Sequence, residues 1–208
     1  MAISSLSKLG VPISGDQSAS NQGLLMPKLQ YRFRVLFQNF GVSKPTTELT
    51  KQVISTTRPS PEFDDIVLDA YNSRIKMAGK PSWGDLTIVV RDDVSGAVSK
   101  LVGEQLQKQF DFFEQSSAAS GTDYKFTTVI ELLDGGNGAY EPGVLETFEV
   151  YGCYLKKAEY KSAEYKTSEA MDITLTVKYD NALQVNQAGQ AVGIGAVVGR
   201  TVRTLATG

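Results

Sequence analysis

Apolar and polar residues alternate in short runs along the middle of this chain. In residues 171–179 every second residue is apolar and polar residues stand between them. A period of two is typical of a strand that buries one face. Runs of this kind, or β-rich runs bounded by prolines, predict strands at residues 29–37, 48–57, 63–71, 85–91, 124–132, 148–152 and 171–179.

One segment follows a different period. Between residues 94 and 115 the apolar residues recur at intervals of three and four, and polar residues fill the opposite side. This spacing predicts one amphipathic helix near 94–115. Asp93 is its candidate N-cap, because its carboxylate can accept amide protons of the first turn.

The two ends of the chain show neither the two-residue period of a strand nor the three-to-four-residue period of a helix. Residues 1–27 are rich in Ser, Gly and Gln, and residues 182–208 are rich in Gly, Ala and Val. We predict a mainly β chain: a single-domain β-barrel or sandwich of about seven strands at residues 28–181, with one flanking α-helix and extended N- and C-terminal arms. We expect the arms to become ordered only on assembly.

The amino-acid composition excludes several kinds of catalytic and metal-binding site. The 208 residues include no histidine and one cysteine, Cys153, and the formal charge is −2. Without histidine there is no Ser-His-Asp or Cys-His site, and one cysteine is too few for a zinc site. We therefore predict a protein that is not an enzyme, with no cofactor or metal. The small net charge gives no general attraction to nucleic acid, and no apolar run is long enough for membrane insertion.

The segment from residue 53 to residue 93 carries the most specific pattern. The run Ser73-Arg74-Ile75-Lys76-Met77-Ala78-Gly79 precedes Trp83-Gly84-Asp85, which opens an alternating strand that ends at Asp92-Asp93. This arrangement resembles the tail tube proteins of contractile-tailed bacteriophages. The alternating run 171–179 is similar to the closing strand of that family, whereas both arms are longer than in its compact members.

This resemblance implies a structural role. Six copies would close into a ring, and rings would stack into a tube inside a contractile sheath, with strands of neighbouring copies joined into one inner barrel. The expected partners are other copies of the chain, the tail sheath protein, and baseplate and tape-measure proteins. DNA would pass through the lumen without specific binding. The expected location is the phage tail of the virion, assembled in the host cytoplasm.

Two sets of residues are candidate contact sites. Three cations beside an apolar anchor suit docking against an acidic surface, so we predict an inter-ring contact loop with Tyr71, Asn72, Arg74, Lys76, Met77, Lys80 and Trp83. A bore that passes DNA must not hold phosphate, so the polar face of the last predicted strand is a candidate lining. Its residues are Asp172, Thr174, Thr176 and Lys178, and Lys178 requires a nearby carboxylate.

Other interpretations remain open. The fold of the family is shared by the tube protein of type VI secretion, and a tail terminator or a baseplate-hub ring would have similar sequence features. A β-sandwich module that binds a carbohydrate or another ligand is the alternative of a different class.

Overall fold

The computed structural model describes residues 27–43, 46–135, 141–166, 168–186 and 189–196. The chain divides into two compact units, Met1–Arg32 and Phe33–Gly208. Of the first unit, only residues 27–32 are described. They include a turn in which the amide of Arg32 donates to the carbonyl of Leu29 (3.2 Å).

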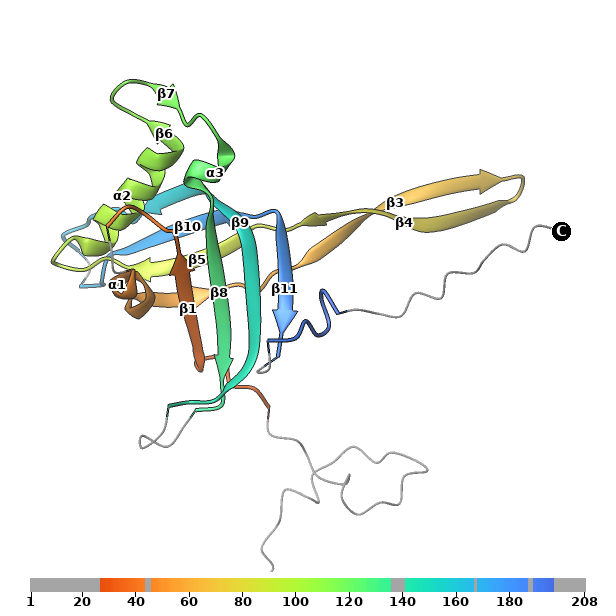
Figure 1. Cartoon of the computed structure of the whole chain (residues 1–208), viewed down its shortest axis with the longest axis horizontal. Helices are drawn as coiled ribbons and strands as arrows, with labels where there is room; N and C mark the ends of the chain where they lie inside the picture. Colours follow the sequence, from red (N-terminus) through yellow and green to blue (C-terminus); the bar gives the residue numbers. More distant parts are fainter. Residues whose placement is uncertain (1–26, 44–45, 136–140, 167, 187–188, 197–208) are drawn as a thin grey trace, which may run out of the picture. The chain divides into compact units, whose positions relative to one another are not determined.

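Seven antiparallel strands form the main sheet (Figure 1). Its path runs β1–β8–β9–β10–β5–β2, and β11 pairs with β9 beside this path. The strands are β1 (Phe33–Gln38), β2 (Val53–Thr56), β5 (Leu86–Arg91), β8 (Phe126–Leu133), β9 (Val144–Tyr160), β10 (Asp172–Lys178) and β11 (Asn181–Val185). In the described residues the path is open, with β1 and β2 at its two ends.

Strand β9 joins two halves of this sheet. Its first half pairs with β8 and β11, whereas its second half pairs with β10. Between the halves lies Gly152, whose φ of +68° is open to glycine at little cost. A residue with that backbone geometry bends a strand, so the sheet turns at this point.

The core fills the inside of this bent sheet. Residues 173, 175 and 177 of β10 are buried, and they lie opposite buried residues of β5. The same alternation occurs on β1 and on most of β9, whereas β8 buries the three consecutive residues 128–130. The mainly β fold predicted from the period of two is therefore confirmed. The main sheet contains β11, which was not predicted, in place of the predicted strand at 63–71, and no closed barrel is found in the described residues.

The predicted helix is present but shorter. Helix α2 spans Ala97–Gln109, and its buried side chains are Val98, Leu101, Val102 and Gln105. The N-cap residue is Gly96, not Asp93, because the helix begins at Ala97; Gly96 has a left-handed backbone (φ 69°). Asp93 still satisfies a first-turn donor, since its Oδ1 accepts the amide proton of Val98 (3.1 Å).

Polar side chains of α2 tie it to its neighbours. The buried Gln105 accepts from the amide of Gly41 (2.9 Å) and donates to the carbonyl of Tyr124 (2.7 Å). Gln109 makes a reciprocal pair with the backbone of Leu155, at 2.8 and 2.9 Å. Buried backbone groups need such partners. Gln109 therefore fixes the helix on β9, and Gln105 fixes it to α3 and to the segment that follows β1.

Several local predictions are wrong. Residues 48–57 are not one strand, because the short helix α1 (Thr47–Lys51) precedes β2. The segment predicted as a contact loop is instead strand β4 (Ser73–Trp83), which pairs with β3 (Pro61–Ala70). The predicted strand at 124–132 begins only after helix α3 (Gly121–Tyr124).

The predicted C-terminal arm also needs correction near the core. Asn181–Val185 is strand β11, paired with β9, and its Ala182 and Val185 are buried. Residues 191–194 then run back along β11, where Val192 donates to Gln184 (2.7 Å). This part of the arm therefore belongs to the sheet in the single chain. Residues 1–26 and 197–208 of the predicted arms lie outside the described residues.

Candidate interaction surfaces

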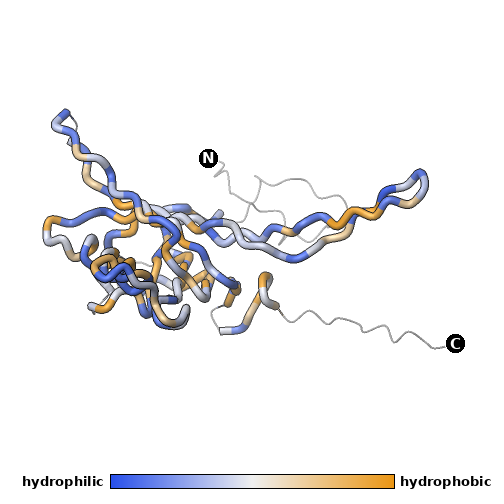
Figure 2. Tube along the Cα trace, turned by 90° about the horizontal axis from the view of Figure 1, so that it is seen from above, coloured by the Kyte–Doolittle hydropathy of each residue, from blue (hydrophilic) through white to orange (hydrophobic). Residues whose placement is uncertain are grey.

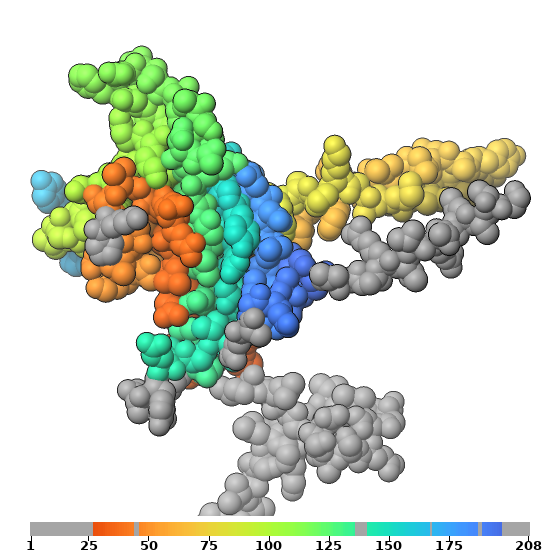
Figure 3. Space-filling model, viewed as in Figure 1, coloured from red at the N-terminus to blue at the C-terminus, as the bar shows by residue number. Residues whose placement is uncertain are grey.

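The β3–β4 hairpin extends away from the body of the unit, as Figures 1 and 3 show. Strand β3 is exposed along its whole length, and on β4 only Gly79 and Trp83 are partly covered. Each of these strands pairs only with the other in the described part of the chain. At the root, the ring of Trp83 packs on the ring of Tyr179, with centroids 5.5 Å apart.

The register of the hairpin gives it two different faces. Directly opposite residues share a face of a two-stranded ribbon. Ile66 lies opposite Met77, and Leu68 lies opposite Ile75, so these four side chains form one apolar face. All four are between 45% and 55% exposed. Figure 2 shows the apolar stretch in the middle of the hairpin.

The other face of the hairpin is mainly charged, with Val67 opposite Lys76. The Nε of Arg74 lies 2.7 Å from Asp69 Oδ1, and the Nζ of Lys76 lies 3.2 Å from Asp65 Oδ2. The two cations predicted to dock on an acidic surface therefore already have carboxylate partners within the hairpin. Exposed ion pairs of this kind contribute little stability, roughly 0–1 kcal/mol each.

The remaining residues of the predicted loop mark its tip, middle and root. Tyr71 and Asn72 form the tip, and Tyr71 has a positive φ of 51° and is fully exposed. Met77 lies on the apolar face. Lys80 lies near the register shift between residues 63 and 65, and Trp83 is the root, as predicted. A role for these residues in contacts between copies stays a prediction.

The predicted lumen residues all lie on β10. Asp172, Thr174, Thr176 and Lys178 alternate with the buried residues of that strand and are half-buried. They share a face with Arg91, Val89 and Thr87 of β5 and with Lys157 and Glu159 of β9. We call this set the outer face of β10. Which side of the sheet would face a bore stays a prediction.

The lysines near this outer face are paired with carboxylates of the same chain. Lys178 has the carboxylate partner it requires, since Asp85 pairs with both Lys178 and Lys156. Both hydrogen bonds lower the pKa of Asp85, and the bond from Lys156 has the larger effect. Lys157 pairs with Glu159, and Lys161 lies 3.9 Å from Asp172.

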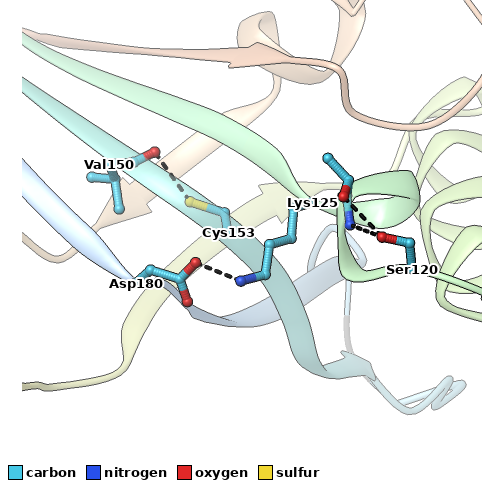
Figure 4. A network of polar contacts seen from close by, with 6 residues as sticks. Ser120, Lys125, Val150, Cys153 and Asp180 are labelled. Carbon is cyan, nitrogen blue, oxygen red and sulfur yellow. Dashed lines mark hydrogen bonds and ion pairs between the residues drawn. The ribbon is translucent and has the colours of Figure 1, made fainter.

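The described residues contain no group of three or more carboxylate or cysteine side chains that could hold a metal ion. A surface hollow of about 590 Å³ lies beside β1 and α3, with Lys108, Asp123 and Lys125 among its lining. All three charges have internal contacts: Lys108 with two backbone carbonyls, Asp123 with the amide of Ser120, and Lys125 with Asp180 (Figure 4).

One exposed feature was missed by the sequence analysis. The spacing of Phe110 and Phe113 fits the apolar side of the predicted helix, but α2 ends at Gln109. The chain then forms a small hairpin, β6 (Phe110–Asp111) and β7 (Ser116–Ser117). Phe112 and Phe113 are 61% and 94% exposed, so this turn is a second apolar surface.

No family model matches the sequence, and no curated protein matches it. Solved structures do match the fold. A chain in the cryo-EM structure of the anti-feeding prophage cap, the cap that terminates its tube, is 16% identical with a TM-score of 0.58, over 82% of this chain and 98% of that chain. A chain of the six-fold symmetrised baseplate of the same prophage is 14% identical with a TM-score of 0.56, over 78% and 98%.

A third match comes from a contractile injection system. A chain in the extended sheath–tube complex of an extracellular contractile injection system is 17% identical with a TM-score of 0.53, over 80% of this chain and 93% of that chain. At these identities the likeness establishes a shared fold. The resemblance to tail tube proteins is thus confirmed at the level of the fold. No helix in the described residues is long and apolar enough to cross a membrane.

Proposed function

We propose that this chain is a structural subunit of the tube of a contractile machine and that it assembles as stacked six-membered rings. The observation that carries the proposal is the apolar face of the β3–β4 hairpin. A ribbon of two strands is marginally stable alone in water, and it gains stability when another surface covers its apolar face.

The shared fold supports the same conclusion. The chains that match it belong to a tube-terminating cap, a six-fold symmetrised baseplate and a sheath–tube complex. The edge strands β1 and β2 end the sheet path, and an unpaired edge is a template for pairing with another chain. In a ring, each edge would pair with a neighbouring copy, and every copy would make the same contacts.

Within this proposal, the machine is a bacteriophage tail. The tube would lie inside the tail sheath, contact baseplate and tape-measure proteins, and be built in the host cytoplasm before it becomes part of the virion. DNA would pass through it. The outer face of β10 suits the lining of such a bore, because its lysines are paired with carboxylates, although Arg91 on the same face adds an exposed cation.

Negative-stain microscopy of the purified full chain tests this function. Rings with six-fold symmetry that stack into tubes of uniform bore are the expected result. Obligate contacts of this kind bury on the order of 2,000–5,000 Å², so assembly should persist at micromolar concentration. Particles that remain single compact monomers at high concentration, across a range of salt, would overturn the proposal.

A tube-terminating ring is the second candidate, since a chain of the cap structure matches at a TM-score of 0.58. A terminator has one surface that stacks and one that does not. The same microscopy distinguishes the two, because a terminator would give single or paired rings that do not grow with concentration.

A further inference from the structure

The outer edge of β11 is covered by the chain's own residues 191–194 (Figure 1). Strand β11 pairs with β9 on one side only. On its other side, the amide of Gln184 donates to the carbonyl of Ile194 (2.8 Å), and the amide of Val192 donates to the carbonyl of Gln184 (2.7 Å). We call residues 191–194 the covering segment.

Hydrogen bonds at the end of β11 turn the chain back towards this edge. The amide of Asn186 donates to the carbonyl of Gln190 (3.0 Å), and the amide of Gln190 donates to Asn186 Oδ1 (2.9 Å). An antiparallel bridge between Val185 and Ala191 follows. The covering segment therefore lies along β11 as a short antiparallel partner.

The side chain of Gln184 holds the covering segment a second time. Its Oε1 accepts the amide proton of Ile194 (3.5 Å), and its Nε2 donates to Glu146 of β9. Glu146 is buried, so the contact orients the Gln184 side chain from below. Backbone and side chain of one residue thus bind the same segment.

Two glycines allow the chain to pass close to β11. Gly193 and Gly195 have positive φ angles of 60° and 99°, which residues with a side chain rarely adopt. A Cβ at Gly193 would clash with the side-chain oxygen of Gln184, and a Cβ at Gly195 would lie 2.5 Å from Leu183 Cδ2. The fit between this part of the chain and the β11 edge therefore depends on glycine.

Without its cover, β11 would present an unpaired strand edge. Such an edge is a template for another chain, and proteins often protect it with charged side chains. The strand Asn181–Val185 has no charged residue. Two identical uncharged strands can pair antiparallel without repulsion between like charges. The β11 edge therefore suits a second copy of itself.

We infer that β11 is a strand-accepting site that the covering segment keeps closed, and that the strand it excludes is β11 of a second copy. A pair of β11 strands related by a two-fold axis is a self-complementary contact, which ends after two copies. A ring needs contacts that repeat around its axis. The covering segment thus leaves pairing between copies to other edges of the sheet, such as β1 and β2.

This inference goes beyond the proposed function and holds whether or not the chain builds tubes. The test is Gly193→Val, which sets a branched side chain against Gln184 and should displace the covering segment. The matched control is Gly96→Val. Gly96 has a similar φ of 69°, but a Cβ there meets nothing within 4 Å.

Hydrogen exchange shows whether the segment has opened. The amide of Gln184 donates to Ile194 and reports on the cover. The amide of Leu183 points the other way, towards β9, because successive amides of a strand alternate, and it reports on β11 itself. We expect Gly193→Val to lose protection at Gln184 at least tenfold and to keep it at Leu183.

Sedimentation velocity then measures association. Gly193→Val should form a species of twice the 22.6 kDa mass of one chain. We expect this dimer at a protein concentration at least ten times lower than that at which the parent or Gly96→Val associates. An open segment with no new association would overturn the inference.

The change Gln184→Pro should reverse the effect. Proline has no N–H to donate at the outer edge, and it is tolerated in an edge strand. Added to Gly193→Val, it should abolish the dimer while the Leu183 amide stays protected. Dimers that persist in the double variant would form through another surface and would overturn the inference.

A second opening variant, Val192→Pro, removes only the amide that donates to Gln184 and should give the same dimer. Unchanged protection of Gln184 in both opening variants, or unfolding of the whole chain in both, would also overturn the inference. A parent that stays monomeric while the opening variants dimerise would overturn the proposed function and support this inference.

Discussion

Leu68 and Ile75 lie directly opposite each other across the β3–β4 hairpin, and about half of each side chain, 48% and 55%, is exposed to solvent. A cross-strand apolar pair stabilises a sheet when it is covered. Here the described residues of the chain leave the pair exposed. The pair therefore marks the face on which contacts between copies should depend.

Replacing both residues with threonine should separate folding from assembly. Threonine keeps the preference for strand but removes most of the apolar surface. We expect Leu68→Thr with Ile75→Thr to retain the circular dichroism and melting temperature of the parent and to lose assembly by sedimentation. The matched change is Arg74→Glu with Lys76→Glu, on the charged face, which should weaken assembly less. A greater loss from the charge reversal would show that the cations form the contact.

Gly152 is the residue at which β9 bends. A Cβ there would lie 2.7 Å from Asp180 Cγ and would displace the carboxylate that pairs with Lys125 (Figure 4). Together with its positive φ, this clash should make Gly152→Ala cost about 2 kcal/mol or more of unfolding free energy. The measurement is urea denaturation.

Gly103 provides the control for that substitution. It lies inside α2, where an added Cβ meets nothing within 4 Å. Gly103→Ala should stabilise the protein by roughly 0.5–1 kcal/mol through helix propensity. If Gly152→Ala were as stable as the parent or more stable, as Gly103→Ala is expected to be, the bend at Gly152 would not require glycine.

The sequence predicted best where one strand face is buried. The alternation of β5 and β10 places Ile88 opposite Leu175 in the core. Prediction from the sequence failed where contacts between residues far apart in the sequence decide the structure. The helix ends at Gln109, whose side chain bonds the backbone of Leu155, and so Phe110 leaves the helical path.

The contact surfaces were only partly predictable. Alternation of Ile75 and Met77 with Arg74 and Lys76 is visible in the sequence, but the turn at Tyr71 and Asn72 has no glycine to signal a hairpin. The partner of Lys178 was expected as a carboxylate, and it is Asp85. Arg74 and Lys76 have carboxylate partners because of the register of the hairpin. The spacing of residues in the sequence does not determine that register.

Glu104 should make stability depend on pH. Its carboxylate accepts from the hydroxyl (2.6 Å) and amide (2.7 Å) of Ser43 and from the amide of Val42 (2.9 Å). These bonds lower the pKa of Glu104 from 4.5 to about 2, and the bond from the Ser43 hydroxyl has the largest effect. Because the folded pKa lies below the unfolded one, this stability is complete above about pH 4.5 and is lost as pH falls towards 2.

The variant Glu104→Gln isolates that contribution. We expect it to be about 1–3 kcal/mol less stable than the parent at pH 7, because hydrogen bonds to a charged acceptor are the stronger kind. The difference should shrink when denaturation is repeated near pH 2.5. A difference that is constant over this range would mean that the carboxylate charge does not hold the Ser43 loop.

Cys153 should be inert in the folded chain. Its thiol is buried, donates to the carbonyl of Val150 (3.3 Å), and has its pKa raised to about 11 by burial (Figure 4). Only the thiolate reacts, so a thiol reagent at pH 8 should label it at least 100 times more slowly than in denaturant. Fast labelling of the native protein would show that the bend of β9 opens readily.

Sedimentation velocity of the purified full chain tests the central claim most directly. The account predicts that, at micromolar concentration, the smallest major species has six times the 22.6 kDa mass of one chain, with larger species at multiples of that ring. A single species of 22.6 kDa at every concentration and salt would contradict it.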